Sequence, residues 1–375
     1  MNKLFKIGGR RLQLIVYALI MGACFHASVG PAYFDENGTG DKLVSSVLAM
    51  DSTRIGACCN CVIDDRLIME CVGMPHRYEI FIIRGDSLAY ESNFLNIGRG
   101  PYEMNNPEFQ YDPVSSRMFL YSRDNLEDKL FTVDVSDFRN VYDPSGWEKK
   151  KLPVLYTRGS LGILSDTVFL NKNYTGTSAM FSLSYAGSKD NTFRCLNFKY
   201  PGEHPDLSLS ARNYLFMGEL KPRPGSSTFV YSCSLSPCVF IFDVINEQIQ
   251  NVRYISRVLP VYKATNDFYN PVAMKDEYIR GFDVFQVSGK YIYIGYNNVT
   301  WGQIRNSIPF KGYPYYFFDR INVFDWEGNF IKRLVLDRPV YRFAADAADK
   351  YLYASSIDLT QENQPDQVLR FELKP

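Results

Sequence analysis

The sequence predicts an all-β fold, and three features of its 375 residues carry that prediction. Aromatic residues make up 15% of the chain, with 27 Tyr and 27 Phe, and such side chains favour strands. No long stretch with the hydrophobic period of a helix follows the first 30 residues. Short segments of alternating apolar and polar residues recur instead, as in residues 321–336, where two of them flank the turn residues Glu327, Gly328 and Asn329.

The recurring segments are regularly spaced. One kind of strand begins at residues 66, 117, 167, 228, 291 and 351, so that successive copies lie 51, 50, 61, 63 and 60 residues apart. A second strand follows each copy, in residues 78–83, 129–135, 179–185, 238–244, 320–326 and 367–373. Six such pairs predict a six-bladed β-propeller over residues 43–375, because radially arranged sheets bury their faces against one another. The alternative, two sandwiches in tandem, does not require six similar units.

The two ends of this region suggest how the ring closes. The last strand ends almost at the C-terminus, and residues 43–50 (LVSSVLAM) are the first strand-like segment after the N-terminal region. We therefore expect the N-terminal strand to pair into the last blade and close it.

The first 24 residues have the organisation of a signal peptide. Four Lys and Arg residues precede the apolar segment 12–21, which is shorter than the about 20 residues of a membrane span. Small residues then precede Cys24, an arrangement that resembles a lipobox and predicts lipidation of Cys24, although Met21 stands where that motif usually has Leu. The alternative is ordinary signal cleavage that discards Cys24. Residues 25–42, which contain several Gly, are predicted to be a flexible tether.

Three segments resemble a known family. Residues 98–104 (GRGPYEM) are similar to a Gly-x-Gly-Pro-x-Glu loop of six-bladed propellers from anaerobic Gram-negative gut bacteria, and residues 278–298 and 321–358 are similar to their last blades. The chain thus resembles the TolB-like six-bladed β-propeller lipoproteins. The resemblance implies a lipid-anchored protein of the cell envelope, expected at the outer membrane and facing the periplasm. It implies no catalytic residues.

Two loops supply candidate ligand-binding residues. In residues 98–104, Arg99 and Glu103 are placed to reach a ligand, or else to form a surface ion pair in a structural turn between blades. The fifth copy carries an insertion, residues 297–318, that is rich in aromatic residues. Its candidates for stacking on sugar rings or gripping a peptide are Trp301, Tyr313, Tyr315 and Tyr316. The alternative is that these rings cover an exposed blade edge.

A further set of polar residues is expected to face the axial channel of the propeller. It comprises Arg280, Asp283, Arg342 and Asp358. The alternative is a buried network in which every polar group is satisfied by a neighbour.

The cysteines of the first repeat are candidates for a metal site or for a disulfide bond. Cys58, Cys59, Cys61 and Cys71 with His76 lack the usual two-residue spacing of zinc ligands, so we expect no metal site. A two-residue turn at Asp64-Asp65 would place Cys71 opposite Cys58, and a three-residue turn would place it opposite Cys59. Free thiols and a disulfide both stay open there. Cys233 and Cys238 bracket a hairpin loop and are candidates for a second pair, whereas Cys195 is expected in the core.

Composition excludes several function classes. The chain has 41 Lys and Arg against 41 Asp and Glu, and no basic stripe, which argues against nucleic-acid binding. With only three His, at 26, 76 and 204, a multi-histidine metal centre is not expected, and we expect no cofactor. The expected function is non-catalytic binding of a partner protein or a glycan by a lipid-anchored envelope protein. The alternative is an envelope hydrolase or lyase that uses carboxylate, Tyr and Arg residues in the axial funnel.

Overall fold

The computed structural model describes residues 38–50, 57–122, 129–151, 161–173, 179–186, 193–202, 204–267, 270–282, 284–361 and 364–374. The predicted signal peptide, Cys24 and most of the predicted tether lie outside the described residues, and so does Asp283.

The described residues form an all-β structure, as predicted, in which antiparallel units of four strands follow one another along the chain. The first unit contains β3 (Ala57–Ile63), β4 (Arg66–Cys71), β5 (His76–Arg84) and β6 (Ser87–Asn96). The second contains β7 (Pro107–Asp112), β8 (Arg117–Ser122), β9 (Lys129–Asp134) and β10 (Glu148–Lys151). The third contains β11 (Leu161–Ile163), β12 (Val168–Lys172), β13 (Phe181–Tyr185) and β14 (Phe193–Cys195).

The later units repeat this order and recruit strands from the N-terminal region. The fourth unit contains β15 (Gly218–Pro222), β16 (Thr228–Cys233), β17 (Cys238–Ile245) and β18 (Gln248–Arg257). The fifth contains β21 (Phe285–Val287), β22 (Tyr291–Tyr296), β23 (Phe318–Asp325) and β24 (Phe330–Val340), with β1 (Asp41–Leu43) parallel to β24. The sixth contains β25 (Arg342–Ala345), β26 (Tyr351–Ile357), β27 (Asp366–Glu372) and β2 (Ser45–Met50). All the strands expected from the repeat are present in these units.

Short elements fill the connections. They are the 3-10 turns η2 (Phe138–Val141) and η3 (Pro144–Gly146), the helices α2 (Leu209–Leu215) and α3 (Trp301–Arg305), and the strand pair β19 (Tyr262–Ala264) and β20 (Val272–Met274). α3 starts with a capping box, in which Thr300 and Gln303 bond reciprocally, and this fixes the beginning of the insertion in the fifth unit.

The N-terminal strand closes the structure, as predicted. In β2, Ser45–Leu48 pair antiparallel with β27, and Ala49–Met50 pair in parallel with β6, the outer strand of the first unit. The resulting eight-stranded sheet is nearly closed, because its end strands β25 and β3 lie next to each other. The predicted tether is two residues too long, since Asp41 and Lys42 already belong to β1.

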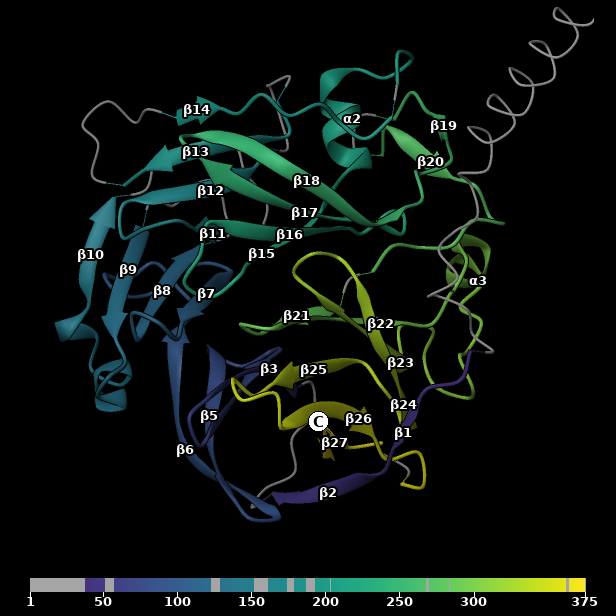
Figure 1. The fold of residues 1–375 in the computed structure, drawn as a ribbon. Coiled ribbons are helices and arrows are strands. Elements are labelled where there is room, and N and C mark those ends of the chain that lie inside the picture. Colours follow the sequence, from purple (N-terminus) through teal and green to yellow (C-terminus); the bar gives the residue numbers. More distant parts are fainter. Residues whose placement is uncertain are drawn as a thin grey trace, which may run out of the picture.

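The units bury both of their faces against their neighbours, and Figure 1 shows them arranged around a common centre with β3, β7, β15, β21 and β25 nearest to it. In β16, for example, Phe229 and Tyr231 pack toward the third unit while Val230 packs toward the fifth. Among the described residues, one buried apolar cluster lies between each pair of successive units, and another lies between the sixth unit and the first. The alternation of side chains along each strand therefore produces a circular order of packed sheets.

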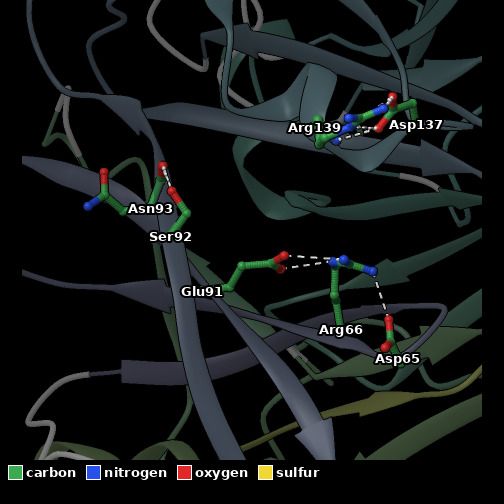
Figure 2. Close-up of polar contacts among 7 residues, drawn as sticks. All are labelled: Asp65, Arg66, Glu91, Ser92, Asn93, Asp137 and Arg139. Atoms are coloured by element: carbon green, nitrogen blue, oxygen red, sulfur yellow. Dashed lines mark hydrogen bonds and ion pairs between the residues drawn. The ribbon is translucent and has the colours of Figure 1, made fainter.

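A charged side chain fastens the first unit to the second. The Arg66 Nε and Nη2 atoms donate to the two oxygens of Glu91, at 2.8 and 3.2 Å, and Nη1 donates to Asp65 Oδ1 at 2.7 Å (Figure 2). Glu91 is the extra residue of a bulge in β6, which turns its carboxylate toward Arg66. The guanidinium group also stacks on Phe138 of the second unit, 4.7 Å from the ring centroid.

The predicted register of Cys71 is wrong by one residue. The turn at Asp64-Asp65 has two residues, because Ile63 pairs with Arg66. However, a bulge at Asn60 inserts one residue into β3, so that Cys71 faces Ala57, and Cys58 faces Glu70. The sulfur atoms of the described cysteines are all unbridged.

Two other expectations for cysteines also need correction. Cys195 is exposed on the edge strand β14 and does not belong to the core. Cys233 and Cys238 end the facing strands β16 and β17, as predicted, but they are free thiols joined by a hydrogen bond.

Candidate functional site

The first strands of the units enclose a central cavity of about 1360 Å³. Its wall includes residues of β3, β7, β11, β15, β21 and β25. A polar network crosses it: Gln286 Nε2 donates to the carbonyl oxygens of Asn60 and Phe343 at 3.2 and 2.8 Å, and Gln286 Oε1 accepts from Lys221 Nζ at 2.9 Å. These bonds join β3, β15, β21 and β25 and involve none of the polar residues that the sequence analysis expected to face the axial channel.

Among the acidic residues that line the central cavity, Glu70, Asp112 and Asp166 are bound to neighbouring groups. Glu70 forms an ion pair with Arg77, and Asp166 forms one with Arg117. Asp112 accepts from Ser115 Oγ at 2.7 Å in its own turn. These carboxylates therefore form ion pairs or a turn hydrogen bond and do not point toward a common centre.

A second cavity, of about 280 Å³, lies where β3 and β25 begin, and two arginines line it. Arg280 reaches it from the segment before β21, and Arg342 is the first residue of β25. Both belong to the predicted candidates. Arg342 and Val284 also line the central cavity, so the smaller cavity adjoins the channel.

The backbone around Arg280 is held on both sides. Arg280 N donates to Val299 O at 3.0 Å, and Gly281 N donates to Ser234 O at 3.1 Å. A Cβ atom at position 281 would overlap the carbonyl oxygen of Cys233, so only glycine permits this approach to the fourth unit. These contacts fix the direction from which Arg280 enters the cavity.

Arg342 is positioned by the residue before it. The single hydroxyl proton of Tyr341 is shared between Asp366 Oδ1 at 2.8 Å and Ala57 O at 3.0 Å, and Asp366 Oδ2 accepts from Ala57 N at 3.2 Å. This arrangement ties together the beginnings of β3, β25 and β27. Burial, followed by the charge of Asp366, raises the pKa of Tyr341, so that its hydroxyl stays a donor.

Aromatic residues of the insertion form one wall of the small cavity. Asn297 Nδ2 donates to the carbonyl oxygens of Tyr315 and Phe317, at 2.7 and 2.6 Å, and so closes the insertion on itself. Tyr316 is 47% exposed, lines the cavity and lies edge-on to Tyr341, with ring centroids 6.3 Å apart. The insertion therefore presents a ring to the same space that holds the arginines.

The guanidinium groups of Arg280 and Arg342 bring positive charge to the wall of this cavity. Burial lowers the pKa of Arg280, and the positive charge of Arg342 lowers it further. Guanidinium groups bind carboxylates and phosphates through paired hydrogen bonds.

The remaining sequence candidates serve other contacts. Trp301 Nε1 donates to Leu235 O at 3.3 Å and its ring packs on the fourth unit, while Tyr313 packs on Phe317 with centroids 5.2 Å apart. Neither they nor Tyr315 line either cavity. Trp301 thus packs on the fourth unit, whereas Tyr313 and Tyr315 pack on other rings of the insertion.

Three candidates outside the insertion are equally absent from the two cavity linings. Glu103 turns back on its own loop and accepts from Gly100 N at 2.8 Å, and Arg99 belongs to the same loop. Asp358 does not face the channel: it accepts from Thr360 and Gln361 in a turn, and the Thr360 bonds lower its pKa.

Sequence reasoning missed Tyr341 and Asn297. Tyr341 is recognisable afterwards from its place before Arg342, at the start of a first strand. Asn297 carries no local signal, because its role depends on the return path of the insertion.

No protein-family model and no curated protein matches the sequence. Among solved structures, the chain is similar to a member of the DUF4221 family from Bacteroides vulgatus, with 10% identity and a TM-score of 0.51 over 90% of this chain and 98% of that one. It also aligns with a putative exported protein from Bacteroides fragilis, with 12% identity and a TM-score of 0.48 over 93% and 98% of the two chains. The first likeness concerns the fold alone. In the described part of the chain, no helix has the length and apolar character needed to cross a membrane.

Proposed function

We propose that the protein is a non-catalytic binding protein of the cell envelope that recognises an acidic glycan, such as one with uronic acid residues. The observation that carries this proposal is the pair Arg280 and Arg342 in one small cavity beside the exposed ring of Tyr316. Sugar rings stack on aromatic side chains, and carboxylates pair with guanidinium groups. At about 280 Å³, the cavity is at the lower end of ligand-pocket sizes, about 300 Å³ and above, and suits the terminal group of a chain.

The scaffold of this proposal is a six-bladed β-propeller of the TolB-like kind. It is supported by the four-stranded units in series and by the circular order of the apolar clusters between them. Tandem sandwiches would not pack the last unit against the first. In such a ring, the small cavity lies at one mouth of the axial channel.

The proposed address is the periplasmic face of the outer membrane, with a lipid on Cys24 as the anchor. Its support is the order of positive residues, apolar segment and small residues before Cys24. Labelled-fatty-acid incorporation into wild-type protein but not into Cys24→Ser would support it. Equal labelling of both proteins would contradict it.

Binding of glycan oligosaccharides to the purified protein tests the function. We expect calorimetry to detect oligosaccharides with uronic acid ends and not their neutral counterparts. Arg280→Gln and Arg342→Gln should each weaken binding at least about tenfold, since a charged hydrogen bond contributes about 1.5–3 kcal/mol. Arg338→Gln is the control, because Arg338 is exposed on β24 and bonds only weakly to Gln367, at 3.4 Å.

Three results would contradict the proposal. Equal binding of acidic and neutral sugars would exclude a role for the arginine pair. Binding of acidic peptides in place of glycans would assign the cavity to a partner protein. Glycan cleavage that is lost in the Arg280 and Arg342 variants would instead identify the alternative function, a hydrolase or lyase.

A further inference from the structure

A buried cluster of metal-ligating side chains lies in the first unit, apart from both cavities. It consists of Cys71, His76 and Glu79 of the β4–β5 hairpin, whose ligand atoms all lie within 4.8 Å of one another. The three residues are 4%, 7% and 2% exposed, respectively. The sequence interpretation combined His76 with four cysteines and rejected that set on spacing. In the structure, the cluster around His76 contains only one of those cysteines, Cys71, and its third member is Glu79.

We propose that Cys71, His76 and Glu79 bind one divalent zinc ion. Sulfur, imidazole nitrogen and carboxylate oxygen are the ligands of zinc, whereas magnesium and calcium prefer oxygen alone. Three protein ligands leave a fourth position for water or a backbone carbonyl.

The distances fit a tetrahedral ion. His76 Nε2 and Glu79 Oε1 are 3.2 Å apart. Zinc–nitrogen and zinc–oxygen bonds of about 2.0–2.2 Å place two tetrahedral ligands roughly 3.3 Å apart. Cys71 Sγ, which contacts Met69 O at 3.9 Å, lies within 4.8 Å of both of these ligand atoms.

Charge and burial support the same assignment. Glu79 is buried and its Oε1 is already paired with His76 Nε2, so a zinc ion between them would add positive charge beside a carboxylate that lies away from solvent. A zinc ion held by one thiolate, one carboxylate and a neutral imidazole has no net charge, which suits a buried site. Binding would release the thiol proton, so zinc affinity should rise with pH.

The hairpin supplies both the ligand order and an entry path. Cys71 ends β4 and His76 begins β5, so the four-residue loop between them brings their side chains together. That loop is open to solvent: Val72 is 65% exposed, Met74 is 41% exposed, and a Cβ atom on Gly73 would meet no atom within 4 Å. An ion can therefore enter from the loop and then fasten the two strands.

Metal analysis of the full chain tests the proposal. Protein equilibrated with zinc and then desalted should retain about one equivalent by mass spectrometry of the metal. Cys71→Ser and Glu79→Gln should each weaken zinc binding at least about tenfold in competition with a chromogenic chelator. The control is Cys58→Ser, a half-buried cysteine of the neighbouring strand that faces Glu70.

Cobalt spectroscopy of the wild-type protein keeps the test decisive even if a variant does not fold. A tetrahedral cobalt spectrum with a thiolate charge-transfer band is expected. Zinc retention that equals that of the Cys71→Ser variant, or a cobalt spectrum without the thiolate band, would overturn the proposal.

Discussion

At the scale of single residues, a buried lysine links the stability of the molecule to pH. Lys172, on β12, is fully buried, and its ammonium group donates to Asn173 O at 2.7 Å and to Asn213 O at 3.5 Å. Its Nζ also lies 5.8 Å from the ring centroid of Tyr200. Burial lowers the pKa of Lys172 to about 7.

This shift makes stability depend on pH. In the unfolded chain Lys172 keeps its ordinary pKa of about 10.4, so between about pH 7 and pH 10 the unfolded state binds more protons than the folded state. The penalty of burying the charged amine is therefore fully present below pH 7 and is relieved as pH rises. From pH 7 to pH 9 the free energy of unfolding should increase by about 2 kcal/mol.

Urea denaturation at the two pH values measures this effect against a Lys172→Met variant. The variant should lack the increase that Lys172 contributes, because methionine has a similar shape and no charge. Identical pH dependence of the two proteins would show that the amine is not desolvated as the structure indicates.

At the scale of elements, the positions of strands follow from the alternation of apolar residues and the spacing of the repeat. The pairing register of the strands and the contacts of their side chains do not. The second and third strands of every unit are where the repeat places them, because packing on both faces imposes the pattern. The bulge at Asn60 has no comparable signature, and it alone displaces Cys71 from its predicted partner.

The insertion shows the same limit for the candidate site. Trp301 and Tyr316 lie in one aromatic segment, yet only Tyr316 faces the small cavity. The aromatic composition identifies the insertion in the sequence. Which of its rings faces the cavity depends on the contacts that the insertion makes with the fourth and sixth units. Arg280 precedes β21 and Arg342 begins β25, and both line the small cavity, but whether they bind a ligand stays a prediction.

Contacts between elements give the second prediction, which concerns Arg66. Arg66→Ala should lower the free energy of unfolding by about 1–3 kcal/mol, because it removes a two-bonded carboxylate contact and the stacking on Phe138. Its side chain is only 22% exposed, so solvent screens the ion pair incompletely. Guanidinium denaturation of the purified protein measures the change.

Arg139→Ala is a matched control in the same region. Arg139 also holds a carboxylate, that of Asp137, but its side chain is 86% exposed (Figure 2). We expect no measurable change in stability for this variant. Equal losses for the two variants would mean that the Arg66 contact does not join the first two units.

At the scale of the whole molecule, the chain closes by interlocking its two ends. β1 lies along the outer strand of the fifth unit, and β2 lies between the last strand of the sixth unit and β6 of the first. One short N-terminal segment thus contacts three units, and it covers sheet edges that would otherwise expose unpaired backbone groups. The small cavity is built from the first, fifth and sixth units, so its shape depends on this closure.

Leu48 of β2 is the residue through which closure can be tested. It is 2% exposed, in the apolar cluster shared by the first and sixth units. Leu48→Ala should destabilise the protein by about 2–5 kcal/mol, since it leaves a cavity at the joint of the ring. Val44→Ala, at a residue that is 78% exposed between β1 and β2, should change stability by less than about 0.5 kcal/mol.

If closure couples all units, thermal unfolding of Leu48→Ala should remain a single transition at a lower temperature. A separate early transition, with the rest melting as in the wild type, would instead mean that the first and sixth units can open without the others.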